Sequence, residues 1–261
     1  MQTLGFGFTT LSGRNPAPSF SLGDLSGIRV WYAPSDISSL FQDAAMTVPV
    51  IADGDPVGAM KDMSGHGHHA FQTNLSKRPI YRNEQGKCSL EFDGSTTFLS
   101  MGVLDMSGTD EVFLATGVKT MSSTSIGTLC ELSESSSSNV GTFALFDRGV
   151  SGGAVSWRSR GLNSSLLTVS RGASLPVSSV YVCTGKISTD VSTLRRNGVE
   201  IGSSTADQGS GNFSASPLYL GARAGGSYYF KGQLYGLCIA TDLQSITTTT
   251  KVESYLSAQT T

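Results

Sequence analysis

The chain has 261 residues, of which 38% are hydrophobic and only 15% are charged, so it can bury a sizeable core behind a surface of small polar side chains. Its formal net charge is -2, so it lacks the excess of Lys and Arg with which proteins bind nucleic acid or an anionic membrane surface. No run approaches the roughly 18–20 apolar residues of a membrane helix, so we expect neither a nucleic-acid partner nor membrane insertion.

The first 28 residues are predicted to form an extended arm. They are rich in Gly, Ser, Thr, Pro and Phe without periodicity, and the Asn-Pro-Ala-Pro run at 15–18 is incompatible with a helix. Such an arm is either a linker or an attachment segment that orders against a neighbouring molecule. Residues 1–10 lack a basic stretch followed by an apolar one, so we expect no secretory signal and expect folding in a cytoplasm.

Residues 29–261 are predicted to form one all-β sandwich of two antiparallel sheets, because short apolar runs alternate with corners rich in Gly, Ser, Asn and Asp. The run 28–32 is rich in the β-branched and aromatic side chains that favour strands. A short helical turn is expected at 37–42 and a tight loop at 53–58. Further strands are expected at 111–119, 128–132, 142–146, 154–158, 165–170, 179–187, 218–221 and 233–239.

A β-hairpin is predicted around the Asn-Gly pair at 197–198, which suits a two-residue type I′ turn because both positions tolerate positive φ. In the simplest register, Leu194 opposes Ile201 on the inner face. Arg195 then opposes Glu200 on the outer face, so an apolar pair points inward and a charged pair points to solvent.

A short helix is predicted over 245–258, near the end of the chain. Val252, Tyr255 and Leu256 have the i, i+3, i+4 spacing of one helical face, which would pack against the sandwich.

The four cysteines are widely separated and have no C-x-x-C spacing, which argues against zinc and thioredoxin-like sites. We expect them to be reduced and buried as small apolar side chains; the alternative is one or two disulfides formed after release from the cell. They are Cys88, Cys130, Cys183 and Cys238.

Several longer motifs add to the strand pattern. In chain order they are Trp-Tyr-x-Pro-Ser-Asp at 31–36, Leu-Phe-Gln-Asp at 40–43, Pro-Val-Gly at 56–58, Asp-x-Ser-Gly-x-Gly-x-His-Ala at 62–70, Arg-Pro at 78–79, Leu-Glu-Phe-Asp-Gly at 90–94, Leu-Tyr-Leu-Gly-Ala-Arg at 218–223 and Leu-Tyr-Gly at 234–236. Over about residues 28–258, the chain resembles the concanavalin A-like, laminin-G-like jelly-roll domain of tailed-bacteriophage virion proteins.

This resemblance implies a concanavalin A-like jelly-roll sandwich in a non-enzymatic structural component of a tailed-phage virion, namely a fibre, collar or capsid-decoration protein. It implies assembly in the host cytoplasm, docking to other virion proteins through the arm, and a homo-oligomer such as a trimer. Two alternatives remain open, because fold does not decide function. One is a receptor-binding carbohydrate-recognition module for host-surface polysaccharide, and the other is a polysaccharide depolymerase.

A metal site is considered because all three histidines, His66, His68 and His69, lie near Asp62, and imidazole with carboxylate suits zinc. The family motif that this segment resembles has Asn at positions 66 and 68 and forms a glycine-rich corner. We therefore expect neither metal nor cofactor and retain these four residues as the alternative ligand set.

Paired acids are the signature of a glycoside hydrolase, and enzymes of the resembling fold carry them at alternate positions of one strand, which places them in one cleft. The nearest pair here is Glu131 and Glu134, whose spacing would put them on opposite faces of a strand. We expect no enzymatic activity and no catalytic residue.

Sugar binding is the more plausible activity, since lectin-like sandwiches hold sugars with an aromatic platform and a few polar groups at loop ends. Trp157 with Arg158, and Tyr228 with Tyr229 beside the glycine-rich loop 221–227, are the candidate ligand-binding residues. An aromatic residue within a strand more often faces the core, which is the competing interpretation for each ring.

Overall fold

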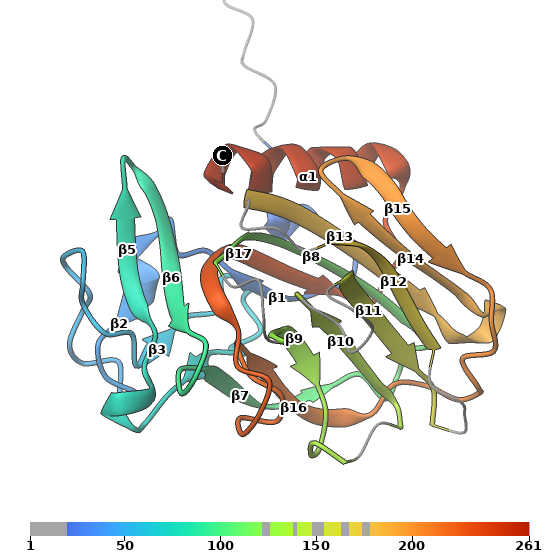
Figure 1. Ribbon diagram of the computed structural model, residues 1–261, viewed down its shortest axis with the longest axis horizontal. Helices are drawn as coiled ribbons and strands as arrows, with labels where there is room; N and C mark the ends of the chain where they lie inside the picture. Colours follow the sequence, from blue (N-terminus) through green and yellow to red (C-terminus); the bar gives the residue numbers. More distant parts are fainter. Residues whose placement is uncertain are drawn as a thin grey trace, which may run out of the picture.

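Two antiparallel sheets stack face to face, and one helix, α1 (Ile246–Thr260), lies across the outside of the first sheet (Figure 1). The arrangement confirms the predicted two-sheet sandwich with a C-terminal helix. Within the described part of the chain, no helix is both long and apolar enough to cross a membrane. This computed structural model describes residues 20–121, 126–137, 140–147, 154–162, 167–173 (backbone only) and 178–260.

The described strands form one eight-stranded and one nine-stranded sheet. The first sheet has the order β15 (Val199–Ser204), β14 (Val191–Arg196), β13 (Ser178–Lys186), β8 (Glu111–Thr120), β17 (Lys231–Ala240), β6 (Lys87–Asp93) and β5 (Ile80–Glu84), with β1 (Ile28–Tyr32) paired to β17. The second sheet has the order β12 (Leu167–Ala173), β11 (Ala154–Arg160), β10 (Thr142–Phe146), β9 (Thr128–Leu132), β16 (Ala215–Leu220), β7 (Leu99–Asp105), β4 (Ala70–Phe71), β3 (Ala59–Met60) and β2 (Leu40–Phe41).

Most predicted strands are confirmed, several with the predicted bounds. The strand expected at 165–170 begins outside the described residues and is seen as β12. The helical turn expected at 37–42 is shorter, because a 3-10 turn, η2 (Ile37–Ser39), passes directly into β2.

The main core lies between the two sheets. Strand β8 illustrates the pattern: Val112 and Leu114 point toward the second sheet, whereas Phe113 and Ala115 point to the opposite side. This strand is therefore buried on both faces, which explains its almost continuous apolar sequence.

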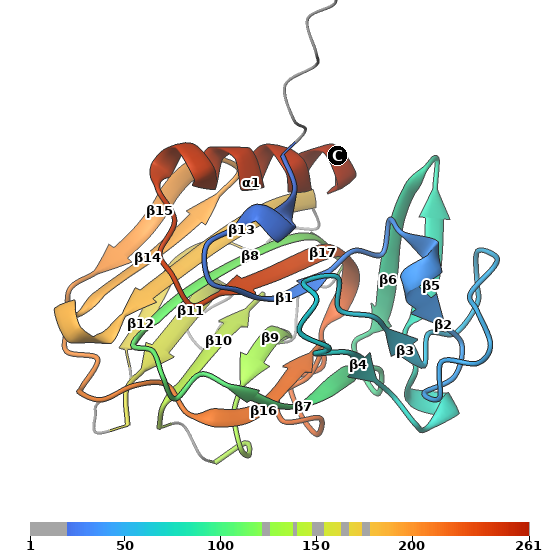
Figure 2. The same ribbon diagram turned by 180° about the vertical axis from the view of Figure 1, so that it is seen from behind.

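A third layer covers the outside of the first sheet. Val252 and Leu256 of α1 pack with Leu22 and Leu25. Leu22 is the first residue of the 3-10 turn η1 (Leu22–Asp24), and Leu25 follows its last residue. Figure 2 shows this turn beside the helix. The predicted helix and its apolar stripe are confirmed. Residues 20–27 lie in this packed layer, so the packed body begins before the predicted arm boundary at 28; residues 1–19 lie outside the described residues.

The hairpin of β14 and β15 corrects the predicted register. Asn197 and Gly198 have φ values of 49° and 82°, as a type I′ turn requires, but a bulge places Leu194 opposite Gly202 instead of Ile201. Arg195 does oppose Glu200 in the ladder. The predicted opposition of these two residues is thus confirmed, but the Arg195 side chain is only 17% exposed and forms an ion pair with Glu253 of α1, at 2.9 Å between Nε and Oε1. The charged pair expected to point to solvent is therefore replaced by a contact with the helix.

All four cysteines are free, and three of them are buried, while Cys88 is half-buried. Burial raises the pKa of the Cys238 thiol to about 12, so the reactive thiolate is scarce at neutral pH. The predicted burial is confirmed for Cys130, Cys183 and Cys238, whereas Cys88 is only half-buried.

Asp93 closes the corner after β6 and gives a first prediction. Its Oδ1 accepts backbone N–H bonds from Ser95, Thr96 and Thr97 at 2.8, 2.8 and 3.0 Å. Burial raises its pKa, but the hydrogen bonds from Thr96 and Ser95 outweigh burial and hold the pKa well below its ordinary value. Replacing Asp93 by Ala should cost about 1–2 kcal/mol at pH 7, as for loss of a helix cap, because the side chain is exposed and partly screened.

The pH dependence of that loss checks the cause. A lowered folded-state pKa contributes stability that is present above the unfolded value of about 3.9 and is lost as pH falls through the folded value. Urea unfolding of wild type and variant should therefore differ at pH 7 and converge as the pH drops below about 3. If the wild type and the variant differ in unfolding free energy by the same amount at pH 7 and below about pH 3, this role for the carboxylate is contradicted.

Candidate functional site

A row of four side-chain positions crosses the second sheet at one level. Tyr219 of β16 opposes Glu131 of β9, Glu131 opposes Ala144 of β10, and Ala144 opposes Arg158 of β11. Directly opposed residues share one face of a sheet. The alternate positions in these strands, such as Trp157, belong to the main core, so the row lies on the outer face.

The loop between β16 and β17 folds over this row. The Arg223 Nε lies 3.4 Å from Glu131 Oε1, and the backbone N–H of Ala224 donates to Glu131 Oε2 at 3.0 Å. The guanidinium carbon of Arg223 lies 5.7 Å from the centre of the Tyr228 ring, which is 38% exposed. The loop thus brings a cation and an exposed aromatic ring to the sheet, and we call Glu131, Arg158, Arg223 and Tyr228 the arginine cluster.

The backbone of this loop is held in unusual conformations. Ala224 and Tyr228 have φ values of 46° and 48°, in the left-handed region that disfavours residues with a Cβ. Gly221 has φ 84°, and any Cβ there would collide with the ring of Phe92. Strain of this kind persists only where surrounding contacts enforce it, and it is frequent at ligand-binding loops.

Arg158 is the least satisfied member of the arginine cluster. Its guanidinium carbon lies 4.9 Å from the centre of the Phe146 ring, and its Nε is buried without a hydrogen-bond partner among the described residues. Burial lowers the pKa of Arg158, and the neighbouring Arg223 lowers it further. The site therefore holds a cation that an anionic group would stabilise.

Glu131 is 2% exposed and balances one of the two arginines. Burial raises its pKa, and Arg223 and the Ala224 N–H oppose that rise. With two guanidinium groups and one carboxylate, the arginine cluster carries one excess positive charge when all three are ionised.

The structure brings together Arg158 and Tyr228, two predicted residues that are far apart in the sequence. Trp157 is 0% exposed: it packs against Phe143 at 5.8 Å between ring centres and donates from Nε1 to the Thr184 carbonyl at 2.9 Å. It is a core residue and supplies no sugar platform, because β11 turns its odd positions inward. Tyr229 is half-buried, and its hydroxyl reaches the Gly225 carbonyl at 3.5 Å.

The alternative metal residues form a hydrogen-bonded corner. The Asp62 carboxylate accepts bonds from the backbone N–H groups of Trp31, Ser64 and His68. His69 Nδ1 accepts the Asp62 N–H at 3.1 Å. The described residues contain no group of three potential metal ligands. The His66 ring is stacked on His68, and its backbone N–H donates to the Ser64 hydroxyl at 3.3 Å.

The two acids considered for catalysis are placed differently from the prediction. Strand β9 ends at Leu132, so the alternation argument does not extend to Glu134, which is exposed beyond the strand end. The charges of Glu134 and Glu131 both contribute to a raised pKa of Tyr219, although burial of the ring contributes more.

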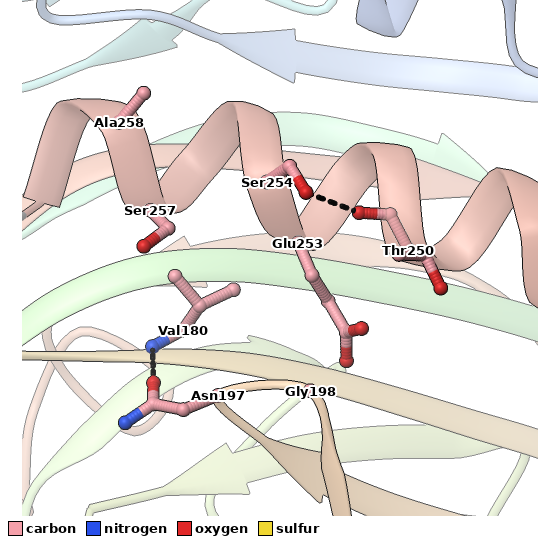
Figure 3. A pocket seen from close by; sticks show the side chains of 8 residues that line it. All are labelled: Val180, Asn197, Gly198, Thr250, Glu253, Ser254, Ser257 and Ala258. Carbon is pink, nitrogen blue, oxygen red and sulfur yellow. Dashed lines mark hydrogen bonds between the residues drawn. The ribbon is translucent and has the colours of Figure 1, made fainter.

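A second concave feature lies between α1 and the β14–β15 hairpin (Figure 3). This groove of about 440 Å³ is lined mainly by small polar side chains. Its acid, Glu253, is already paired with Arg195, and the Asn197 Oδ1 accepts the Val180 N–H at 2.8 Å. Its strongest polar groups are thus engaged within the fold, which leaves the arginine cluster as the better candidate.

Comparison with known families decides the classification. Residues 108–242, just over half of the chain, match the model of the concanavalin A-like lectin/glucanases superfamily. The chain belongs to this superfamily. The matched region holds all four members of the arginine cluster, and the fold assigned above is that of the superfamily. No curated protein matches the chain.

Solved structures agree on the fold of this superfamily member. The serotype G botulinum neurotoxin binding domain is 12% identical with a TM-score of 0.56, covering 77% of this chain and 48% of that chain. A Trypanosoma rangeli sialidase is 11% identical with a TM-score of 0.55, covering 89% and 33%. The Ruminococcus gnavus IT-sialidase CBM40, bound to α2,3-sialyllactose, is 18% identical with a TM-score of 0.46, covering 64% and 95%. At these identities, the likeness of the first two concerns the fold alone.

Sequence reasoning missed Glu131 as a binding-site residue and did not select Arg223. The alternation in Val155-Ser156-Trp157-Arg158 did contain a signal, because it places the Trp with Val on one face and the Arg with Ser on the other. No local pattern links Glu131 to a loop 92 residues later.

Proposed function

We propose that this chain is a non-enzymatic carbohydrate-recognition module that binds sugar on the outer face of its second sheet. The observation that carries this proposal is the arginine cluster, in which an exposed aromatic ring lies beside charged groups that can bond to sugar oxygens. Binding sites typically combine such apolar surface with a few placed polar groups. The superfamily, which by its description joins lectins and glucanases, supports sugar as the ligand class.

A glycan array that includes bacterial capsular and lipopolysaccharide glycans tests this function. We expect binding by wild type and about a three- to tenfold loss in Tyr228→Ala, since stacking on an aromatic ring contributes about 0.5–1.5 kcal/mol. Binding to no glycan, or binding that survives both Tyr228→Ala and Arg158→Gln, would overturn the proposal.

The proposed module cleaves no glycan. Glu131 is buried and paired with Arg223, which gives it a structural partner instead of an open position across a cleft from a second acid. Incubation with host capsule or lipopolysaccharide should release no reducing ends above a buffer control. A time-dependent release that Glu131→Gln abolishes would contradict this.

A structural role in a tailed-phage virion is the second candidate function. Its support is that the residues shared with the phage domain build corners: Asp36 caps η2, Asp62 ties β1 to the histidine corner, and Asp93 closes the corner after β6. Such residues serve a rigid displayed frame. The protein would then belong to a fibre, collar or capsid decoration, as a homo-oligomer such as a trimer, attached through the N-terminal residues that precede the packed layer.

Imaging of antibody-labelled particles tests this role. A label at the distal tail supports host recognition by the displayed sandwich, and a label across the capsid supports decoration. Absence of the protein from purified particles would overturn the virion role while leaving sugar recognition to the array experiment.

A further inference from the structure

We infer that the arginine cluster selects an acidic sugar, whose single carboxylate is bound by the guanidinium of Arg158 while its ring lies against Tyr228. This inference rests on the proposed sugar recognition and names the chemical class of the ligand. Uronic acids in bacterial polysaccharides are one source of such a group, and any pyranose that carries one carboxylate has the same chemistry.

The charge count favours one carboxylate. Arg158 and Arg223 contribute two positive charges, and Glu131 cancels one of them through its ion pair with Arg223. One excess positive charge matches a carboxylate, whereas a phosphate monoester carries close to two negative charges at neutral pH. A neutral sugar would leave the excess charge without compensation.

The state of Arg158 supports the same ligand. Each other ionised group of the arginine cluster has a partner, since Arg223 and Glu131 pair with each other. Arg158 lies over the Phe146 ring with its Nε buried and without a hydrogen-bond partner among the described residues. A planar guanidinium matches a carboxylate in a two-bond fork, which half-buried Arg158 can offer through its terminal N–H groups.

The position of Tyr228 fixes where the sugar ring would lie. The loop holds this residue at φ 48° and leaves it 38% exposed, and the guanidinium carbon of Arg223 lies 5.7 Å from the centre of its ring. The Tyr228 phenol also lies near enough to Arg158 for its charge to affect the pKa of that guanidinium. Carboxylate and pyranose can therefore be bound at adjacent points of one site.

Calorimetric titration of the full chain with trigalacturonate, its methyl ester, a hyaluronan tetrasaccharide and maltotriose tests the inference. We expect an acidic probe to bind at least about tenfold more tightly than the methyl ester or maltotriose, since a hydrogen-bonded charge pair contributes about 1.5–3 kcal/mol. Binding should weaken as salt is raised. Arg158→Gln should lose about tenfold or more, and Arg158→Lys should recover only part of the loss because it lacks the fork.

Two further variants sharpen the test. Glu131→Gln keeps an oxygen for the Ala224 N–H but removes a negative charge, so acidic probes should bind more tightly, by about threefold or more. Lys251→Gln removes one positive charge from exposed α1, on the side of the first sheet, and should leave binding within about twofold.

The outcomes separate the two proposals. If the array shows binding to neutral glycans that Tyr228→Ala abolishes and Arg158→Gln does not, the inference of an acidic ligand is overturned and the proposed sugar recognition stands. Equal affinity for trigalacturonate and its methyl ester, no binding of either acidic probe, or unchanged acid binding in Arg158→Gln would each overturn the inference. Absence of binding to any glycan on the array would overturn the proposed function as well.

Discussion

Replacing Arg223 by Met is expected to lower the free energy of unfolding by about 3–5 kcal/mol at pH 7, because it leaves a buried carboxylate without its counter-charge. Glu131 is 2% exposed, and Arg223 is the only cation in an ion pair with it among the described residues. The Ala224 N–H still donates to Oε2, and the Ser133 hydroxyl and the charge of Arg158 make smaller contributions to stabilising the carboxylate. Urea unfolding followed by circular dichroism measures the loss.

The same variant has a defined pH dependence. Burial raises the folded-state pKa of Glu131, and removal of Arg223 takes away the main opposing effect. A carboxyl with a raised folded pKa causes no penalty below its unfolded value of about 4.3, and the penalty grows as pH rises through the folded value. The destabilisation by Arg223→Met should therefore be smaller at pH 4 than at pH 7.

The double variant Glu131→Leu, Arg223→Met provides the control. Replacement of a buried ion pair by apolar side chains is often neutral, so this variant should recover most of the loss seen in Arg223→Met alone. If the single variant loses less than about 1 kcal/mol at pH 7, or if the double variant is less stable than the single one, the buried pair does not hold the loop on the sheet.

Truncation of Trp157 to Ala should cost about 3–5 kcal/mol, because it opens a large cavity in the core between the sheets. The ring packs against Phe143, which in turn packs against Phe213 at 5.7 Å between ring centres. The variant also leaves the Thr184 carbonyl without the indole N–H. Thermal and urea unfolding should both detect the loss.

Tyr228→Ala is the matched control, because it removes another aromatic ring that the sequence selected as a sugar-binding candidate. The Tyr228 ring is 38% exposed, so its removal should change the unfolding free energy by no more than about 1 kcal/mol while weakening glycan binding. Loss of the Trp157 ring should thus lower stability, whereas loss of the Tyr228 ring should weaken glycan binding. A stable Trp157→Ala protein that has lost sugar binding would reverse these assignments.

The motifs in the first hundred residues and the superfamily match over 108–242 belong to the same sandwich. The motif residues Asp62 and Asp93 use their carboxylates to hold backbone N–H groups at corners. The arginine cluster lies on the other, later part of the chain. These corner residues lie earlier in the chain than the arginine cluster, although the motif at 218–223 contributes Arg223 to that cluster.

Local chemistry in the sequence was sufficient to predict most of the longer strands, the Asn-Gly turn and the C-terminal helix, but not β2–β5 or β7. Alternation of apolar and polar residues depends only on neighbours along the chain, and a type I′ turn depends on two residues that accept positive φ. The strands at 28–32, 128–132 and 142–146 have the predicted bounds for this reason.

Only the tertiary structure decided which distant segment each strand face packs against. The bulge beside Leu194, the pairing of Arg195 with Glu253, and the packing of Leu22 under α1 all depend on segments far away in the sequence. The same holds for the arginine cluster, where pairing of four strands aligns Tyr219, Glu131 and Arg158 and a later loop adds Arg223. Strand register and burial arise from long-range packing, and a one-residue shift in register would move a side chain to the opposite face.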